Sequence, residues 1–480
     1  MRAAYAPNGS PMRTLAAISC AIVLLSVDSA AVVAHSAGSR LTDCTPIGGL
    51  RRAADPGRAP GTERRASVHD LMFFVGVDYR ADNVLWETDG TREGTVRLGR
   101  RTGRVEWWPT VAGNTMFVNT KGEGEGSELW SSDGTEAGTV LLKRFVPGEV
   151  GGDPRYLTPL GDQLIFTACD RVHGRELWRS DGTTAGTKLI EDIVPGDRGS
   201  HPFDLVSAGS VTYFHLNDGP SACGLWRTDG TANGTKPICP GQASGAFGDD
   251  LTAVGRTLFF AGWDPEHGSE LWRTDGTAQG TEMVTDLVLG PGGSDPQHLE
   301  AVGGRLYFSA STPALGSELY TSDGTGAGTG LVDDIAPGSA GSDPQGFAGS
   351  RGIVYFSADD GAGSGLWRTD GTMPGTYLVR RFRSPDHIFG VGALTFFVVD
   401  HPRHGAELWR TDGTRAGTFE LHGLGEWPAQ LDGFTALKGR LLFVDSYVDL
   451  WASDGTTRGT VMLRDLYLRR RPDESLSGHR

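Results

Sequence analysis

The residues best spaced for chemistry in this sequence are nine aspartates, each of which begins an Asp-Gly-Thr string. A carboxylate of this kind can transfer protons in catalysis or bind a cation such as Ca²⁺. Catalysis needs unlike groups gathered at one place, and nine equivalent carboxylates in successive strings do not provide that. Calcium takes roughly six to eight oxygen ligands, whereas each string offers one carboxylate. We therefore assign these aspartates to turns, where the side chain accepts a hydrogen bond from the backbone N–H two residues on.

A second set of acids could form calcium-binding sites. In four copies of the repeat described below, one acid lies two residues before the repeated aromatic residue and another lies fourteen residues after it. If the hairpin register is centred on the turn, the two acids face each other, which is unfavourable unless a cation or a proton lies between them. The plainer alternatives are a register shifted by one residue, or acids solvated at a sheet edge. The pairs are Glu176 with Asp192, Glu270 with Asp286, Glu318 with Asp334, and Asp449 with Asp465.

Four tryptophans outside the repeated motif are the weaker candidates for ligand binding: Trp107, Trp108, Trp263 and Trp427. An exposed Trp on a loop can stack on a sugar ring or hold a peptide, and a buried one fills an irregular part of the core. Three His-Gly-x-Glu-Leu-Trp strings begin with His173, His267 and His404. We interpret these histidines as turn residues in separate repeats, because none has the additional His or Cys ligands that a zinc site needs. No nucleophile elbow or phosphate-binding loop precedes a helix, so no catalytic residue is assigned.

The element that must position these residues is a tandem repeat. The pattern Leu-Trp-x-x-Asp-Gly-Thr-x-x-Gly-Thr occurs nine times at intervals of 42 to 48 residues, with Tyr in place of Trp once. Such a period indicates one supersecondary unit per copy. The aromatic and Asp positions are Trp86 and Asp89, Trp130 and Asp133, Trp178 and Asp181, Trp226 and Asp229, Trp272 and Asp275, Tyr320 and Asp323, Trp367 and Asp370, Trp409 and Asp412, and Trp451 and Asp454.

Each copy contains four strand-like segments. In the fifth copy they are residues 251–254, 258–262, 270–274 and 282–287, the last two joined by the Asp-Gly-Thr turn. We expect the first Gly of the motif to supply a positive φ, the second Gly to repeat that role, and Leu and Trp to point to opposite faces. Four antiparallel strands in about 40–50 residues are typical of a β-propeller blade. The sequence thus predicts an all-β propeller of eight or nine four-stranded blades over residues 66–467.

The motif resembles a known family. The strings Glu128–Thr135 and Glu270–Thr277 are similar to the ELWxxDGT repeat family of exported, hyalin-like bacterial proteins, often myxobacterial. Four copies depart from the pattern at the Glu position, with Val84, Gly224, Gly365 and Asp449, and one at the aromatic, with Tyr320. The resemblance implies tandem repeats and export, and it brings no established activity.

The ends of the sequence indicate an exported chain. An apolar run from Leu15 to Val27 follows two arginines, so residues 1–34 are expected to be a signal peptide, 35–65 a flexible linker and 468–480 a basic tail. No other segment could span a membrane. Four cysteines remain, and the sequence favours a Cys223–Cys239 disulfide, with Cys44–Cys169 as a guess. The expected location is the periplasm, the cell surface or the extracellular space.

These observations lead to a functional expectation. The formal net charge of −15 argues against nucleic acid as a partner. Because the sequence signal specifies architecture, we expect a non-catalytic propeller, not an enzyme and without a cofactor, that binds a protein or a polysaccharide. Two alternatives remain: a glycan hydrolase or lyase with its site on variable loops near the axis, and an adhesin made rigid by calcium. Convergent Asp, Glu, His or Arg side chains in one axial pocket would favour the enzyme.

Overall fold

The chain was analysed as a computed structural model. The structure describes residues 67–68, 70–77, 83–98, 103–106, 109–122, 126–146, 152–218, 224–239, 250–401, 405–423, 431–445 and 449–466. Its sheets form a β-propeller of nine blades, which confirms the predicted fold and settles the blade number at nine. In the part described, the only helix is the short 3-10 turn η1 (Met373–Gly375), and no helix is long and apolar enough to cross a membrane.

Each blade is one antiparallel sheet of consecutive strands, and we number the blades in chain order. The innermost strand of blade 2 is split in two, so this sheet has five strands. Blades 1 to 4 comprise β1 (Ser67–Val68), β2 (Leu71–Val77), β3 (Asn83–Thr88) and β4 (Val96–Arg97); β5 (Arg104–Val105), β6 (Thr110–Ala112), β7 (Thr115–Gly122), β8 (Gly126–Ser132) and β9 (Val140–Arg144); β10 (Arg155–Leu160), β11 (Gln163–Asp170), β12 (Gly174–Ser180) and β13 (Lys188–Glu191); and β14 (Pro202–Ala208), β15 (Val211–Leu216), β16 (Leu225–Thr228) and β17 (Lys236–Pro237).

The remaining five blades repeat the same order of four strands. They comprise β18 (Thr252–Val254), β19 (Thr257–Asp264), β20 (Gly268–Thr274) and β21 (Glu282–Thr285); β22 (Gln297–Val302), β23 (Arg305–Thr312), β24 (Gly316–Ser322) and β25 (Gly330–Asp333); β26 (Gln345–Ser350), β27 (Ile353–Asp359), β28 (Ser364–Thr369) and β29 (Tyr377–Arg381); β30 (Asp386–Val391), β31 (Leu394–His401), β32 (Gly405–Thr411) and β33 (Phe419–Gly423); and β34 (Leu431–Leu437), β35 (Arg440–Asp445), β36 (Asp449–Ser453) and β37 (Val461–Asp465).

The third strand of each blade joins it to both neighbours. Leu85 packs in the apolar cluster between blades 1 and 2, whereas the adjacent Trp86 packs in the cluster between blades 1 and 9. Side chains alternate across the pleat, so Leu and Trp must point to opposite faces. The same division holds for Leu319 and Tyr320 in blade 6. The repeated Leu-Trp pair therefore explains how each sheet buries both of its faces.

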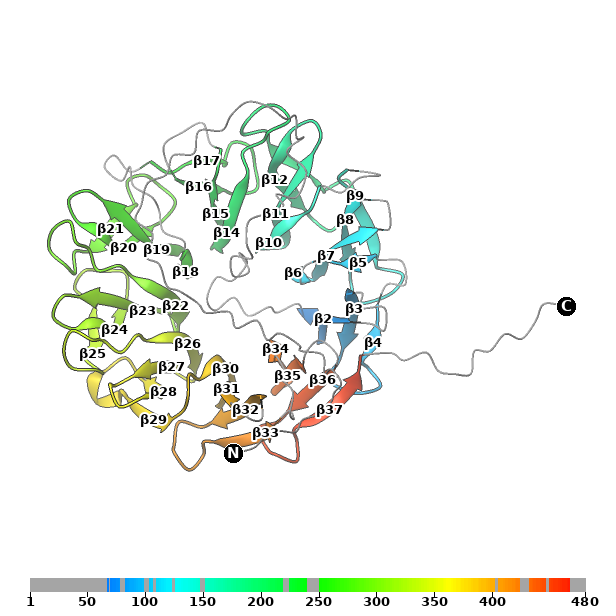
Figure 1. Cartoon of the computed structure of the whole chain (residues 1–480). Coiled ribbons are helices and arrows are strands. Elements are labelled where there is room, and N and C mark those ends of the chain that lie inside the picture. Colours follow the sequence, from blue (N-terminus) through cyan, green and yellow to red (C-terminus); the bar gives the residue numbers. More distant parts are fainter. Residues whose placement is uncertain are drawn as a thin grey trace, which may run out of the picture. The chain divides into compact units, whose positions relative to one another are not determined.

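The ring closes by side-chain packing between blades 9 and 1. Phe74 and Trp86 of blade 1 share a buried cluster with Leu437 and Leu466, and Lys438 Nζ donates to the Asp89 carbonyl oxygen at 3.2 Å. No strand is exchanged across this seam, because each described sheet contains only strands consecutive in the chain. Figure 1 shows the first strands of the blades, such as β10, β14, β22 and β26, nearest the centre of the ring.

The Asp-Gly-Thr turn confirms the structural role expected for the nine aspartates. Asp89 Oδ1 accepts hydrogen bonds from Thr91 N at 2.9 Å and Thr91 Oγ1 at 2.7 Å, and these bonds hold the pKa of Asp89 below its usual range. The first Gly is left-handed, with φ of 87° at Gly90. The second Gly does not repeat this role, contrary to our expectation. A Cβ on Gly94 would lie 2.0 Å from Asp89 Oδ1, so this Gly leaves room for the carboxylate.

Candidate functional site

The two ends of the propeller differ in chemistry. Strands alternate in direction within a blade, so all Asp-Gly-Thr turns lie at one end. The connections between successive blades lie at the opposite end, together with the turns between second and third strands; we call it the connection end. The turn end is built alike in every blade, whereas the connections differ in sequence. A site that is not repeated is therefore expected at the connection end, near the innermost strands.

Several connections enter the innermost strand through a strained backbone. Asp295 and Asp343 each precede a proline yet have φ of 49° and 46°, a left-handed conformation that the residue before proline rarely adopts. A β-bulge follows inside the strand, and in blade 6 it places His298 at φ 55°. Hydrogen bonds hold both positions: Asp343 N donates to Ser317 O at 3.2 Å, and His298 N donates to Asp250 Oδ2 at 3.1 Å. The matching bulge residues Tyr156, Asp204 and His387 have the same left-handed backbone, so this conformation belongs to the blade design and does not by itself mark a site.

A cavity of about 260 Å³ opens at the connection end between blades 6 and 7. The innermost strand β22 and its neighbours β23 and β24 form one wall, and the segment that leads into β26 forms the other. The lining groups are one imidazole, one carboxylate, two hydroxyls and two carboxamides, with no Lys or Arg among them. These groups can exchange several hydrogen bonds with a neutral polar ligand. The lining residues are Gln297, His298, Ser309, Ser317, Asp343 and Gln345.

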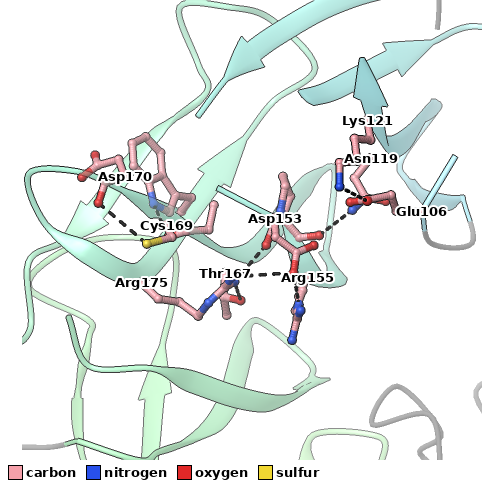
Figure 2. Close-up of polar contacts among 12 residues, drawn as sticks. Glu106, Asn119, Lys121, Asp153, Arg155, Thr167, Cys169, Asp170 and Arg175 are labelled. Carbon is pink, nitrogen blue, oxygen red and sulfur yellow. Dashed lines mark hydrogen bonds and ion pairs between the residues drawn. The ribbon is translucent and has the colours of Figure 1, made fainter. Parts of the chain in front are cut away.

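The matching positions in blade 3 carry charges. Arg155 pairs with Thr167 in the sheet as Gln297 pairs with Ser309, and Arg175 is the second residue of its blade's third strand, as Ser317 is. Arg175 Nη1 donates to Asp153 O at 2.9 Å and to Thr167 Oγ1 at 3.3 Å, and its guanidinium forms an ion pair with the Asp153 carboxylate at 3.8 Å. Burial lowers the pKa of Arg175 to about 10. Figure 2 shows these side chains in contact, and they occupy space that is open in blade 6.

The charged network extends to blade 2. Asn119 Nδ2 donates to Pro154 O at 2.9 Å, and Lys121 Nζ lies 4.0 Å from Glu106 Oε1 (Figure 2). Burial, followed by the nearby Asp153 carboxylate, raises the pKa of Glu106. A hydrogen bond from Asn119 to the Pro154 carbonyl thus links blade 2 to the connection that enters blade 3, at the end where blades 6 and 7 have a cavity, and each blade has ion pairs of its own there.

The acid pairs considered as calcium ligands have the predicted register, and their glutamates have protein hydrogen-bond partners. One carboxylate oxygen of each paired aspartate Asp192, Asp286 and Asp334 is buried without a hydrogen-bond partner among the described residues. Asp449 pairs with Asp465 in the sheet, which confirms the proposed register. Glu318 is fully buried and accepts from Ile335 N, Ala336 N and Ser342 Oγ; Glu176 and Glu270 accept equivalent bonds from the connections of their own blades. The alternative of Glu side chains solvated at an edge is therefore wrong. Burial raises the pKa of Glu176 to about 7. Among the described residues, no group of three or more His, Cys, Asp or Glu could hold a metal ion.

None of the other predicted residues that the structure describes lines the cavity. Trp263 is 46 % exposed on β19 and lies opposite Ser269 in the sheet. His173 and His267 occupy turns of separate blades, where each Nδ1 lies 2.9 Å from an aspartate three residues earlier. Cys169 and Cys239 are disulfide-bonded, but their proposed partners Cys44 and Cys223 lie outside the described residues, so both pairings stay predictions. Trp107, Trp108, Trp427 and His404 also lie outside them.

Sequence reasoning missed all six cavity residues, because none belongs to the repeated motif. A signal was present in the connections, where Ser-Asp-Pro-Gln occurs at residues 294–297 and again at 342–345. This second, shorter repeat places Gln297 and Gln345 at matching positions of adjacent blades, one on each side of the cavity.

Comparisons with known proteins concern the fold alone. No family model matches the chain, and no curated protein matches it, so the ELWxxDGT resemblance stays a prediction. Similar solved structures include a puromycin hydrolase (16 % identity, 74 % of this chain, 59 % of that chain, TM-score 0.38) and oligopeptidase B from Leishmania major (12 %, 72 %, 52 % and 0.42). A structure from a study of two prolyl endopeptidases matches at 12 % identity over 73 % of this chain and 54 % of that one, with a TM-score of 0.41. This chain thus spans between half and three fifths of their lengths.

The expectation of a non-catalytic scaffold is corrected. Propeller folds serve both as enzymes and as binding modules, so the fold gives no ground for excluding catalysis. The similar solved structures include a hydrolase and peptidases. The cavity gathers an imidazole and a carboxylate between two blades, and not in the axial pocket named in the sequence analysis. The error arose because nine equal motifs at the turn end contain no information about the connection end.

Proposed function

We propose that the cavity between blades 6 and 7 is a hydrolytic active site for a neutral, hydrogen-bonding substrate. The observation that carries the proposal is the meeting of His298 and Asp343 from adjacent blades in one cavity. Imidazole and carboxylate are the side chains that most often transfer protons in enzymes. Here Asp343 accepts a proton from the attacking water, and the His298 imidazole on the opposite wall hydrogen-bonds to the substrate at the reacting bond.

The other lining residues support recognition of an uncharged substrate. Gln297, Gln345, Ser309 and Ser317 can donate to and accept from hydroxyl or amide groups, and no cation is present to bind a phosphate or a carboxylate. The left-handed backbone at His298 and Asp343 directs both side chains from short, hydrogen-bonded segments. Groups held in this way need little rearrangement when the substrate binds.

The experiment is a hydrolysis assay with two sets of probes, 4-nitrophenyl glycosides of neutral sugars and peptide 4-nitroanilides. We expect turnover of at least one set, and a decrease of about 10²–10⁴-fold in Asp343→Asn and in His298→Asn. Asn tolerates the left-handed backbone of both positions. The control is His387→Asn, because His387 occupies the matching bulge of blade 8 at φ 49° and is not a cavity residue. Turnover of neither set, or equal turnover by all four proteins, contradicts the proposal.

A further inference from the structure

The innermost strand that forms part of one cavity wall carries a buried acid at a position where blades 3 and 5 have Thr. Glu300 of β22 is 8 % exposed, and its Oε2 is buried without a hydrogen-bond partner among the described residues. Thr158 and Thr252 occupy the same position in blades 3 and 5, where each hydroxyl donates to a carbonyl of the next blade, at 3.3 Å and 3.0 Å. An unpaired carboxyl is costly to bury, so its retention here points to a function.

The sheet register places Glu300 one residue pair beyond Gln297 and Ser309, which line the cavity; Glu300 itself is not a lining residue. Gln297 pairs with Ser309, and the next pair inward, across the bulge, is Glu300 with Tyr307. Ser309 and Tyr307 are two residues apart on β23, so their side chains share one face. Tyr307 packs in the apolar cluster between blades 6 and 7, which identifies this face as the one that borders the cavity. Adjacent pairs on one face are about 7 Å apart, a distance that a Glu side chain can largely span.

The surroundings of Glu300 keep its carboxyl protonated. Tyr307 lies opposite on β23, and β18 of blade 5 carries no titratable residue. The acids near this strand are Asp250, whose carboxylate accepts from His298 N, and Asp343, which lines the cavity. Burial alone raises the pKa of Glu300 to about 8. The exposed Asp343 and the buried Glu300 are therefore two carboxyl groups in contrasting environments, an arrangement that assigns one as acid and the other as base.

We infer that Glu300 is the general acid of this site and that the substrate is a neutral glycoside. The inference rests on the proposed function. Glu300 donates its proton to the glycosidic oxygen, the bond from this oxygen to the anomeric carbon breaks, a water oxygen bonds to that carbon, and the water proton passes to Asp343. Solvent then restores both protonation states. The assignment of a glycoside rests on the pair of carboxyl groups, one acid and one base, which is the arrangement that cleaves glycosidic bonds.

The test compares leaving groups. Glu300→Gln removes the proton donor, and we expect a decrease of about 10²–10⁴-fold in kcat for a glycoside whose leaving group is an alcohol. For the 2,4-dinitrophenyl glycoside of the same sugar, whose leaving group needs no proton, we expect less than about a tenfold decrease. A structural role for Glu300 would lower both rates equally.

A second variant separates loss of function from loss of fold. Glu300→Thr restores the residue of blades 3 and 5, so it should fold at least as well as the wild type and show the same leaving-group dependence as Glu300→Gln. If the wild type cleaves glycosides through Asp343 but both Glu300 variants keep full activity on alcohol leaving groups, the assignment of Glu300 is wrong and the proposed function stands. If the wild type cleaves only the peptide nitroanilides, the glycoside assignment is wrong. If neither is cleaved, the proposed function itself has failed.

Discussion

Blades 3 and 6 share one sheet design and differ in what fills their connection ends. In blade 3, Arg175 reaches across to Asp153 and Thr167 and closes the space between the strands and the connection. In blade 6, Ser317 and Ser309 occupy the matching positions, and a cavity remains. The residues repeated in every blade therefore determine the scaffold, and the residues that differ between blades determine the candidate site. The predictions below exchange or perturb the features that distinguish the two blades.

The largest effect is expected from giving blade 6 the arginine of blade 3. In Ser317→Arg the long guanidinium side chain enters the cavity, so turnover should fall by at least about 100-fold while the circular dichroism spectrum stays that of the wild type. Full activity in a folded Ser317→Arg protein would place the active site elsewhere.

Stability should depend on pH through the buried acid of blade 6. The pKa of Glu300 rises from 4.5 to about 8 on folding, so the folded chain holds this proton more tightly than the unfolded chain does. The free energy of unfolding should consequently be highest near pH 5 and fall by about 3 kcal/mol towards pH 8, at up to about 1.4 kcal/mol per pH unit.

Glu300→Thr should remove most of this dependence of the unfolding free energy on pH. Glu176, whose pKa is about 7, should account for part of what remains. Urea unfolding at pH 5, 6, 7 and 8 measures the effect. An unfolding free energy that rises steadily over this range in the wild type would contradict the assignment.

The reverse exchange tests whether the charged network of blade 3 is structural. Arg175→Ser leaves the Asp153 carbonyl oxygen and the Thr167 hydroxyl without their donor, so we expect a loss of about 2 kcal/mol in unfolding free energy. Turnover should be unchanged, because blade 3 is remote from the cavity in the ring order. A loss of turnover without a loss of stability would instead indicate that blade 3 carries the site.

The smallest effect is expected at the turn end, where the two blades are alike. Asp181 and Asp323 each accept two hydrogen bonds from the Thr two residues later. Asp181→Ala and Asp323→Ala should each lower the melting temperature by about 1–2 °C and leave turnover unchanged. Unequal effects in a thermal scan would show that the turns are not interchangeable.

The blades could be predicted from sequence because the same residues, with the same local conformational preferences, recur in nine copies. Leu and Trp point to opposite faces, Asp closes the turn and the first Gly is left-handed, as the motif indicates. The role of the second Gly could not be predicted, because the Asp carboxylate folds back against it only in three dimensions. The same is true of the nine Ser or Thr residues before the Asp, of which Thr88 bonds to Thr95 at 2.8 Å.

The candidate site was not predicted, since it depends on connections that bring single residues of two blades together. One clue was available in the sequence. The position twenty residues before the repeated aromatic is Thr in three copies, as Thr110, Thr158 and Thr252. In the sixth copy the same position is Glu300. A comparison of the copies at that position, instead of within the motif, would have identified blade 6 as the exceptional one. What the comparison could not provide is the cavity near Glu300, which is formed by the bulge at His298 and by the segment before β26.

The most direct test of the account is a crystal structure of the Asp343→Asn protein soaked with the neutral oligosaccharide that the wild-type protein cleaves fastest. The account predicts sugar density between blades 6 and 7, with hydrogen bonds to Gln297 and Gln345 and a glycosidic oxygen facing Glu300. Sugar bound instead beside Arg175, or stacked on Trp263 with the cavity between blades 6 and 7 empty, would contradict it.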